Sequence, residues 1–154
     1  MICITGSPGS GKSTVARELR KMGYKVLGIH DIPGAEQCIR DQEADLECLS
    51  YLVKDMGDSV ILEGHYSHLM GCSYVFILYR DEERIKTTLE SRGYDPEKVK
   101  ENLDAQRCDQ FFSESLDLLP RGRIFRIEAV EGNPEATAIR IDTIMRKMNI
   151  SLLS

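Results

Sequence analysis

The chain alternates short runs of apolar residues with longer segments in which apolar residues recur every three or four positions. A short apolar run predicts a strand that is buried on both faces, because every side chain of such a strand meets other protein. The longer pattern predicts an amphipathic helix that turns one face to the core. Five strands are predicted in this way, at about 2–5, 25–29, 59–63, 74–78 and 123–127.

Predicted helices separate these strands, at about 12–22, 43–57, 81–92, 96–118 and 134–148. The segment from His30 to Glu43 is polar, and its Pro33-Gly34 pair predicts a turn. Strands that alternate with helices favour a parallel sheet covered on both faces, since parallel neighbours need crossover connections. We therefore expect an α/β fold with a five-stranded parallel sheet, in a single domain over residues 1–154.

A glycine-rich stretch joins the first strand to the first helix: Gly6-Ser7-Pro8-Gly9-Ser10-Gly11-Lys12-Ser13, followed by Thr14. Its spacing is G-x-x-x-x-G-K-[ST], that of the phosphate-binding loop (P-loop). Gly9 and Gly11 let the chain curl until successive backbone N–H groups converge on one anion. The helix that follows at once adds its unpaired N–H groups and the positive end of its dipole. The sequence therefore predicts a P-loop NTPase fold.

Lys12 is expected to reach the outer phosphates of ATP, and the Ser13 hydroxyl to ligate Mg²⁺. The alternative is a flexible Gly/Ser turn with an incidental lysine. It explains Lys12 poorly, because a cation in the first turn of a helix opposes the dipole unless an anion is bound there. Ligands of parallel α/β folds bind beyond the carboxyl ends of the strands, which is where this loop would lie.

The third predicted strand ends in Glu63-Gly64-His65. Since parallel strands end on the same side of a sheet, Glu63 is expected beside Ser13, orienting Mg²⁺ or its water ligands as a Walker-B carboxylate does. The alternative is a strand-end carboxylate that is merely solvated. His65 is a candidate to orient the nucleophile or shuttle a proton, and a hydrogen-bonded structural imidazole fits the sequence equally well.

Phosphoryl transfer also needs mobile cations over the transferred group, and Arg92-Gly93-Tyr94-Asp95-Pro96 is a candidate lid. The alternative is helix capping, in which Gly93 ends one helix and Asp95 with Pro96 starts the next. The two interpretations are compatible, because capping does not exclude a phosphate contact by Arg92. Further candidate cations are Arg80, Arg84 and Arg107.

Composition narrows the function classes. The 20 Lys and Arg residues against 25 Asp and Glu give a net charge of −5, which argues against extensive direct nucleic-acid binding. No apolar run approaches membrane-spanning length and the first strand starts too early for a secretory signal, so we expect a cytoplasmic protein. The five cysteines form no C-x-x-C pair and are expected to be free thiols rather than a zinc site.

Over nearly its whole length the chain resembles the adenylate kinase isoenzyme 6 family of archaeal and nuclear P-loop nucleoside monophosphate kinases. The similarity lies in Thr5 to Thr14, in Glu63-Gly64-His65, and in the run from Arg92-Gly93-Tyr94 to Glu101-Asn102-Leu103. It implies a broad-specificity kinase that moves a phosphoryl group between ATP and AMP or a related monophosphate with Mg²⁺. It also implies intrinsic ATPase activity and a role in ribosome biogenesis (small-subunit maturation and rRNA processing) through a small-subunit ribosomal protein.

The resemblance also implies residue roles. The acceptor monophosphate would bind a segment at about 29–45, and Arg92 would close on ATP from a lid at about 91–101. Glu63 and His65 would serve Mg²⁺ and catalysis. The implied ATP-binding residues are Gly9, Gly11, Lys12, Ser13 and Thr14.

Three departures from the family pattern leave the function open. The acceptor segment is shorter than in relatives, and Thr88 and Gln106 stand where many relatives carry an arginine and a glutamate. Loss of a phosphate-clamping arginine costs on the order of 10³ in rate unless Arg80 or Arg84 substitutes. An ATP-driven assembly factor with little kinase activity, or a P-loop kinase for another small metabolite, are therefore the alternatives to a monophosphate kinase.

Overall fold

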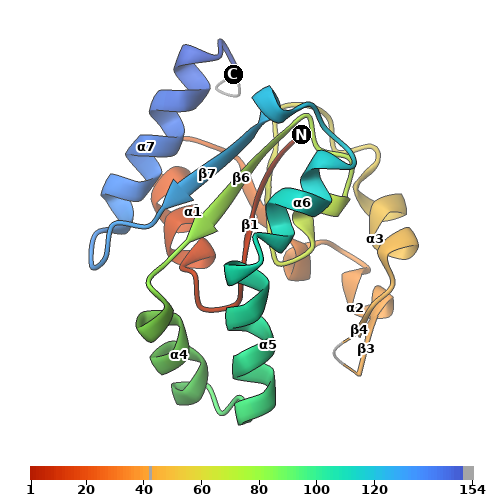
Figure 1. Cartoon of the computed structure of the whole chain (residues 1–154). Coiled ribbons are helices and arrows are strands. Elements are labelled where there is room, and N and C mark those ends of the chain that lie inside the picture. The colour runs from red at the N-terminus through yellow and green to blue at the C-terminus, as the bar shows by residue number, and fades with distance from the viewer. Residues whose placement is uncertain (42, 151–154) are drawn as a thin grey trace.

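The computed structural model describes residues 1–41 and 43–150. Its main sheet has five parallel strands in the order β2-β5-β1-β6-β7 (Figure 1). The strands are β1 (Ile2–Gly6), β2 (Val26–Gly28), β5 (Ile61–Glu63), β6 (Tyr74–Tyr79) and β7 (Ile124–Glu128). The predicted α/β fold with a five-stranded parallel sheet is confirmed, and β1, which leads into the phosphate loop, is its central strand.

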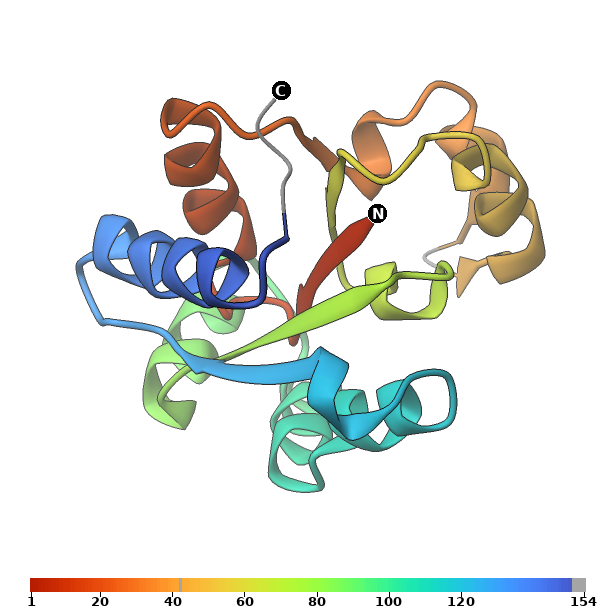
Figure 2. The same cartoon turned by 90° about the horizontal axis from the view of Figure 1, so that it is seen from above.

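Helices cover both faces of the sheet, with α1 and α7 on one face and α2, α3 and α6 on the other (Figure 2). The helices are α1 (Lys12–Lys21), α2 (Ala35–Cys38), α3 (Leu46–Val53), α4 (Glu82–Ser91), α5 (Pro96–Arg107), α6 (Gln110–Leu116) and α7 (Pro134–Lys147). Short 3₁₀ turns are η1 (Ile29–Asp31), η2 (Ser67–Leu69) and η3 (Arg121–Arg123).

Successive residues of β1 point into two different cores. Ile2 and Ile4 pack with residues of α1 and α7, whereas Cys3 packs with residues of α2, α3 and α6. All three side chains are buried. A strand with protein on both faces cannot alternate apolar with polar residues, which is why the strand sequences are continuously apolar.

The predicted single helix at 96–118 is wrong, because the chain forms α5 and α6 with a break between them. Asp109 adopts a left-handed conformation with φ 55°, which ends the first helix. Its carboxylate accepts hydrogen bonds from Tyr79 and Arg126 on neighbouring strands. Tertiary contacts therefore stabilise a turn that carries neither glycine nor proline as a sequence signal.

The polar segment between His30 and Glu43, for which only a turn at Pro33-Gly34 was predicted, contains α2 and the start of a small antiparallel hairpin. The hairpin strands are β3 (Ile39–Arg40) and β4 (Glu43–Ala44). The predicted helix start near Glu43 is also wrong, since α3 begins at Leu46 after Asp45, whose side chain accepts the Cys48 N–H. An aspartate before an apolar periodic run is an N-cap signal that outweighs periodicity alone.

The expectation of free thiols is wrong for four of the five cysteines. Disulfides join Cys3 to Cys72 and Cys38 to Cys48, and Cys108 is free and exposed. The parallel pairing of β1 with β6 brings Cys3 and Cys72 together across 69 residues, with their Cα atoms 5.9 Å apart. Such tertiary proximity has no signature in cysteine spacing.

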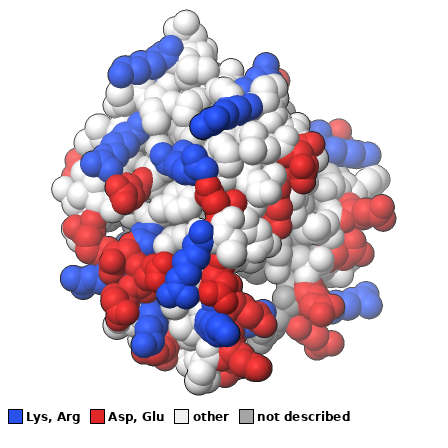
Figure 3. Space-filling view, in the orientation of Figure 1, with Lys and Arg blue, Asp and Glu red and all other residues white. Residues whose placement is uncertain are grey.

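Charges of both signs are mixed on the face shown in Figure 3, most densely around α4 and α5. Some of these charges form ion pairs, among them Arg107 with Glu82 and Lys98 with Glu101. Within residues 1–41 and 43–150, no helix combines the length and the apolarity needed to cross a bilayer.

Candidate active site

The glycine-rich loop has the backbone geometry of an anion cradle. Gly11 precedes α1 with φ 96°, a left-handed conformation that L side chains rarely adopt. A Cβ on Gly6 would lie 2.6 Å from the Leu78 carbonyl oxygen, so only glycine lets the loop leave β1 beside β6. The loop is thus fixed by packing and delivers its N–H groups to the carboxyl edge of the sheet.

Lys12 folds back into this cradle, where its Nζ donates to the carbonyl oxygens of Gly6 at 2.8 Å and Ser7 at 2.9 Å. Burial lowers the pKa of Lys12 to about 8, with Glu63 opposing the shift and Arg92 adding to it. A half-buried ammonium that donates to carbonyl oxygens would be stabilised by an anion, because a phosphate supplies opposite charge at a site that water screens less than it does at the surface.

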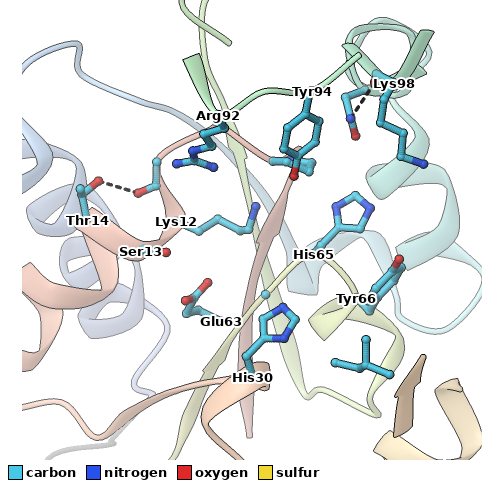
Figure 4. Close-up of a pocket in the computed structure, with 16 residues that line it drawn as sticks. Lys12, Ser13, Thr14, His30, Glu63, His65, Tyr66, Arg92, Tyr94 and Lys98 are labelled. Atoms are coloured by element: carbon cyan, nitrogen blue, oxygen red, sulfur yellow. Dashed lines mark hydrogen bonds between the residues drawn. The ribbon is translucent and has the colours of Figure 1, made fainter. Parts of the chain in front are cut away.

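Glu63 ends β5, in parallel register with Ile4 of β1 and Gly28 of β2. The predicted meeting of this carboxylate with the phosphate loop is therefore seen, and Lys12 extends between Glu63 and Arg92 (Figure 4). Burial raises the pKa of Glu63, and Lys12 is the largest opposing influence.

The donor set fits a magnesium site. The Ser13 hydroxyl and the Glu63 carboxylate line the same cavity, and both are oxygen ligands of the kind Mg²⁺ prefers. Residues 1–41 and 43–150 hold no cluster of three or more His, Cys, Asp or Glu that could bind a metal by themselves. Mg²⁺ here would thus depend on phosphate oxygens and water for its other ligands, as is usual in phosphoryl-transfer sites.

His65 also lines the cavity, and its Nδ1 lies 3.4 Å from the Gly6 carbonyl oxygen. Burial lowers the pKa of His65 to about 4, and the charge of Lys12 acts in the same direction. The ring is therefore neutral at pH 7 and can orient a ligand by hydrogen bonding, but a pKa this low makes it a weak base for a proton shuttle. His68 faces away from the cavity and is buried against α6.

The candidate lid shows the predicted helix caps and also brings Arg92 to the cavity. Arg92 follows α4 and lines the cavity, while Gly93 adopts a left-handed φ of 81° as a helix-terminating residue. Asp95 accepts the Lys98 N–H at 2.9 Å and Pro96 opens α5. Two capped helix ends thus place a guanidinium over the phosphate loop.

One cavity of about 550 Å³ brings all the predicted site residues together. Its lining includes Gly9, Gly11, Lys12, Ser13, Thr14, Glu63, His65 and Arg92. His30 and Ile39 line it from the predicted acceptor segment, and Tyr94 and Lys98 from the predicted lid, although the sequence assigned none of the four a role of its own. Tyr66 also lines the cavity and lies in neither predicted segment. For Tyr66 and Tyr94 the available signal was their position beside His65 and Gly93, whereas His30 and Ile39 enter through turns and a hairpin that the sequence did not predict.

Arg80 lies on the other side of the loop, beside a cavity of about 190 Å³ that Gly9, Thr88 and Arg92 also line. Its Nη1 donates to the Gly9 carbonyl oxygen at 2.8 Å and to Thr88 Oγ1 at 2.9 Å. Its other guanidinium nitrogens bind Glu131. Of the further candidate arginines, Arg80 is thus the one against the loop, whereas Arg107 pairs with Glu82 on the surface.

The chain matches a known family model and shares its fold with solved kinase structures. A family model described as an AAA domain matches residues 2–109. Among solved structures, shikimate kinase from Acinetobacter baumannii in complex with shikimate has a similar fold, with a TM-score of 0.69 at 15% identity over 97% of this chain and 94% of that one. Shikimate kinase from Bacteroides thetaiotaomicron gives a TM-score of 0.60 at 13% identity over 94% and 97%.

Two archaeal proteins that bear the name "Putative adenylate kinase" are much more similar in sequence. The one from Thermoplasma volcanium is 43% identical over 146 residues, which is 94% of each chain. That from Thermoplasma acidophilum is 42% identical over 133 residues, which is 86% of this chain and 90% of its own. The chain therefore belongs to the family of these archaeal "Putative adenylate kinase" proteins, as its resemblance to the archaeal and nuclear adenylate kinase isoenzyme 6 family implied.

Proposed function

We propose that this protein is a broad-specificity nucleoside monophosphate kinase that transfers the terminal phosphoryl group of ATP to AMP or a related monophosphate. The observation that supports this best is the single cavity in which Lys12, Arg92 and Glu63 meet. Its volume of about 550 Å³ lies within the range of small-molecule sites. Such a constellation suits phosphoryl transfer, in which the protein mainly positions and neutralises charge.

In this proposal each residue of the site has its own role in phosphoryl transfer. The loop amides and Lys12 hold the outer phosphates of ATP, and Arg92 neutralises charge on the phosphoryl group in flight. Ser13 and Glu63 would hold Mg²⁺, which when bound supplies further neutralisation of the phosphate oxygens. An oxygen of the acceptor phosphate forms the new bond to the terminal phosphorus as the bond to the leaving ADP oxygen breaks.

The acceptor end of the cavity is supported by residues of the predicted monophosphate segment. His30 and Ile39 line it from that segment. Tyr66 lines it from the loop after β5, and Figure 4 shows it together with His30. An aromatic ring and an aliphatic side chain provide apolar surface for a base without base-specific hydrogen bonds. This composition favours an enzyme that accepts several monophosphates.

A coupled assay of ADP formation from ATP tests the proposal, with AMP, CMP, GMP, UMP and small hydroxylated metabolites as acceptors. We expect acceptor-dependent ADP with monophosphates. Lys12→Ala should lose most turnover, whereas Lys21→Ala, a matched change at the exposed end of α1, should retain it. Absence of acceptor-dependent ADP across all monophosphates would contradict the proposal.

A partner-stimulated ATPase that acts in assembly of the small ribosomal subunit is the second candidate. It is favoured by the small acceptor segment, whose described residues form the 3₁₀ turn η1, a four-residue helix and two two-residue strands. For this function we expect phosphate release with water as the only acceptor, accelerated by a small-subunit ribosomal protein. Fast transfer to AMP without such a partner would contradict it.

A further inference from the structure

A chain of buried and partly buried hydrogen bonds that the proposed mechanism does not use links α6 to β1 and to the loop after β5. Glu114 Oε2 on α6 lies 2.6 Å from His68 Nε2, and His68 Nδ1 lies 3.0 Å from Thr5 Oγ1. Thr5 Oγ1 also lies 3.1 Å from the carbonyl oxygen of His65. Thr5 has no exposed surface and His68 is 2% exposed, so these groups have one another as partners rather than water.

While the His68 ring is neutral and Glu114 is ionised, the protons in this chain cannot satisfy all three contacts at once. The Thr5 hydroxyl has a single proton and two acceptors within reach, His68 Nδ1 and the His65 carbonyl oxygen. With Glu114 ionised, the Nε2 of His68 carries a proton and donates to it. A neutral ring then has a bare Nδ1, which takes the Thr5 proton. A cationic ring donates from Nδ1 to Thr5, whose own proton turns to the His65 carbonyl.

We propose that His68 is a positioning residue for phosphoryl transfer, which acts through Thr5 by setting whether the His65 carbonyl is tied to β1. The role in transfer rests on the function proposed above. Thr5 immediately precedes the phosphate loop, and the His65 ring lies 3.4 Å from Gly6 O, which also accepts from Lys12. A shift of the His65 backbone would therefore move the His65 ring relative to Gly6 O and Lys12 in the phosphate loop.

Two other bonds hold the same loop in either state. The Gly64 N–H donates to the Ile4 carbonyl oxygen at 3.1 Å, and the Ser67 hydroxyl donates to the same oxygen at 2.7 Å. The loop therefore stays docked on β1 when the Thr5 proton turns away from His65. The effect is a local adjustment of His65 rather than an opening of the fold.

The charged surroundings of His68 determine which state prevails. From α6, Glu114 is the carboxylate on its ring and Phe111 packs edge-on at 5.3 Å between centroids. His65 from the loop after β5, and Lys98 and Glu101 from α5, line a cavity of about 280 Å³ together with His68. A charge on His68 lowers the pKa of His65. Burial lowers the pKa of His68 and Glu114 opposes the shift. His68 is thus neutral at pH 7, and the tie to His65 forms on acidification.

Carbon-13 NMR of protein with labelled histidines tests this coupling without any turnover. We expect the His65 carbonyl signal to shift with the same midpoint as the His68 ring, and to lose that response in Thr5→Val. Glu114→Gln should move both midpoints to lower pH, because it removes the carboxylate that favours the cationic ring. A His65 carbonyl that ignores the His68 titration would overturn the proposal. Since this readout needs no substrate, its failure is distinct from failure of the kinase function.

Kinetics test the consequence for transfer. The ratio of wild-type kcat to Thr5→Val kcat should rise on acidification through the His68 midpoint by about two- to tenfold, the worth of one hydrogen bond. Protonation of Glu63 lowers kcat by the same factor in both proteins, so its effect does not appear in the ratio. Thr5→Ser keeps the hydroxyl and should follow the wild type, as should Thr143→Val on the exposed side of α7. A ratio that is independent of pH would overturn the positioning role.

Discussion

Arg80 Nη1 donates to Thr88 Oγ1 at 2.9 Å, so the Arg80 guanidinium contacts the side chain that the family resemblance marks as a departure. The same nitrogen donates to the Gly9 carbonyl oxygen, and Gln106 binds the backbone N–H and carbonyl of Arg80 through its amide. Both family departures on this side of the loop, Thr88 and Gln106, therefore contact Arg80. This arrangement supports Arg80 as the substitute cation.

Replacing Arg80 by alanine should weaken the use of ATP by about 10- to 100-fold in kcat/KM, because charge-assisted hydrogen bonds of about 1.5–3 kcal/mol are lost next to the phosphate loop. Steady-state kinetics with ATP varied measures this. Arg84→Ala on the exposed face of α4 is the matched control and should differ little from the wild type. Equal losses of kcat/KM in Arg80→Ala and Arg84→Ala would contradict a specific role of Arg80 in the use of ATP.

The pKa of about 8 at Lys12 predicts that ATP binding takes up protons. Near pH 8 about half of the free lysines are neutral, and bound phosphate restores the ordinary high pKa, so binding should take up about half a proton. Uptake should vanish near pH 6.5, where Lys12 is already charged. Calorimetry in two buffers with different ionisation enthalpies measures the number of protons taken up per ATP bound.

Lys12→Arg is the control for this titration, because a guanidinium stays protonated across the range. Any binding that survives in this variant should show no proton uptake at pH 8. Uptake of the same size in Lys12→Arg would assign the proton to another group.

Glu63→Gln should lower turnover by about tenfold or more and raise the Mg²⁺ concentration needed for half-maximal rate, because a neutral amide is a weaker ligand for a hard cation. In the wild type, the raised pKa of Glu63 should make the rate fall on acidification at a higher pH than an ordinary glutamate would. Magnesium titrations of initial rate measure both effects. Glu97→Gln in the exposed first turn of α5 is the control, and an unchanged magnesium dependence in Glu63→Gln would contradict the assignment.

The sequence predicted those parts of the site that short-range patterns determine. The loop from Gly6 to Ser13 specifies its own turn, and the parallel sheet then places Glu63 beside it. Within the predicted acceptor segment, His30 and Ile39 could not be singled out, because a three-residue 3₁₀ turn and a hairpin of two-residue strands are too short to show a period. Asp109 was missed for another reason: its left-handed turn is held by Tyr79 and Arg126, which are distant in sequence.

The cysteines illustrate the same limit, since their pairing depends on strand order and not on spacing. Cys3 meets Cys72 only because β6 lies next to β1, and Cys38 meets Cys48 only because the unpredicted α2 packs against α3. The absence of a C-x-x-C motif therefore says nothing about longer-range pairs.

The two disulfides give the last prediction. Protein purified without reductant, then denatured and alkylated, should gain one alkyl group, at Cys108, and five groups after reduction. Reduction should also lower the free energy of unfolding, by about 4 kcal/mol for the loop of 69 residues and about 3 kcal/mol for that of 10 in the chain-entropy model. Denaturant melts with and without dithiothreitol measure the change, and Cys108→Ser should leave it intact. Five alkyl groups without reduction would contradict both bonds, whereas three would assign a bond to only one pair, which Cys38→Ala or Cys72→Ala would then identify.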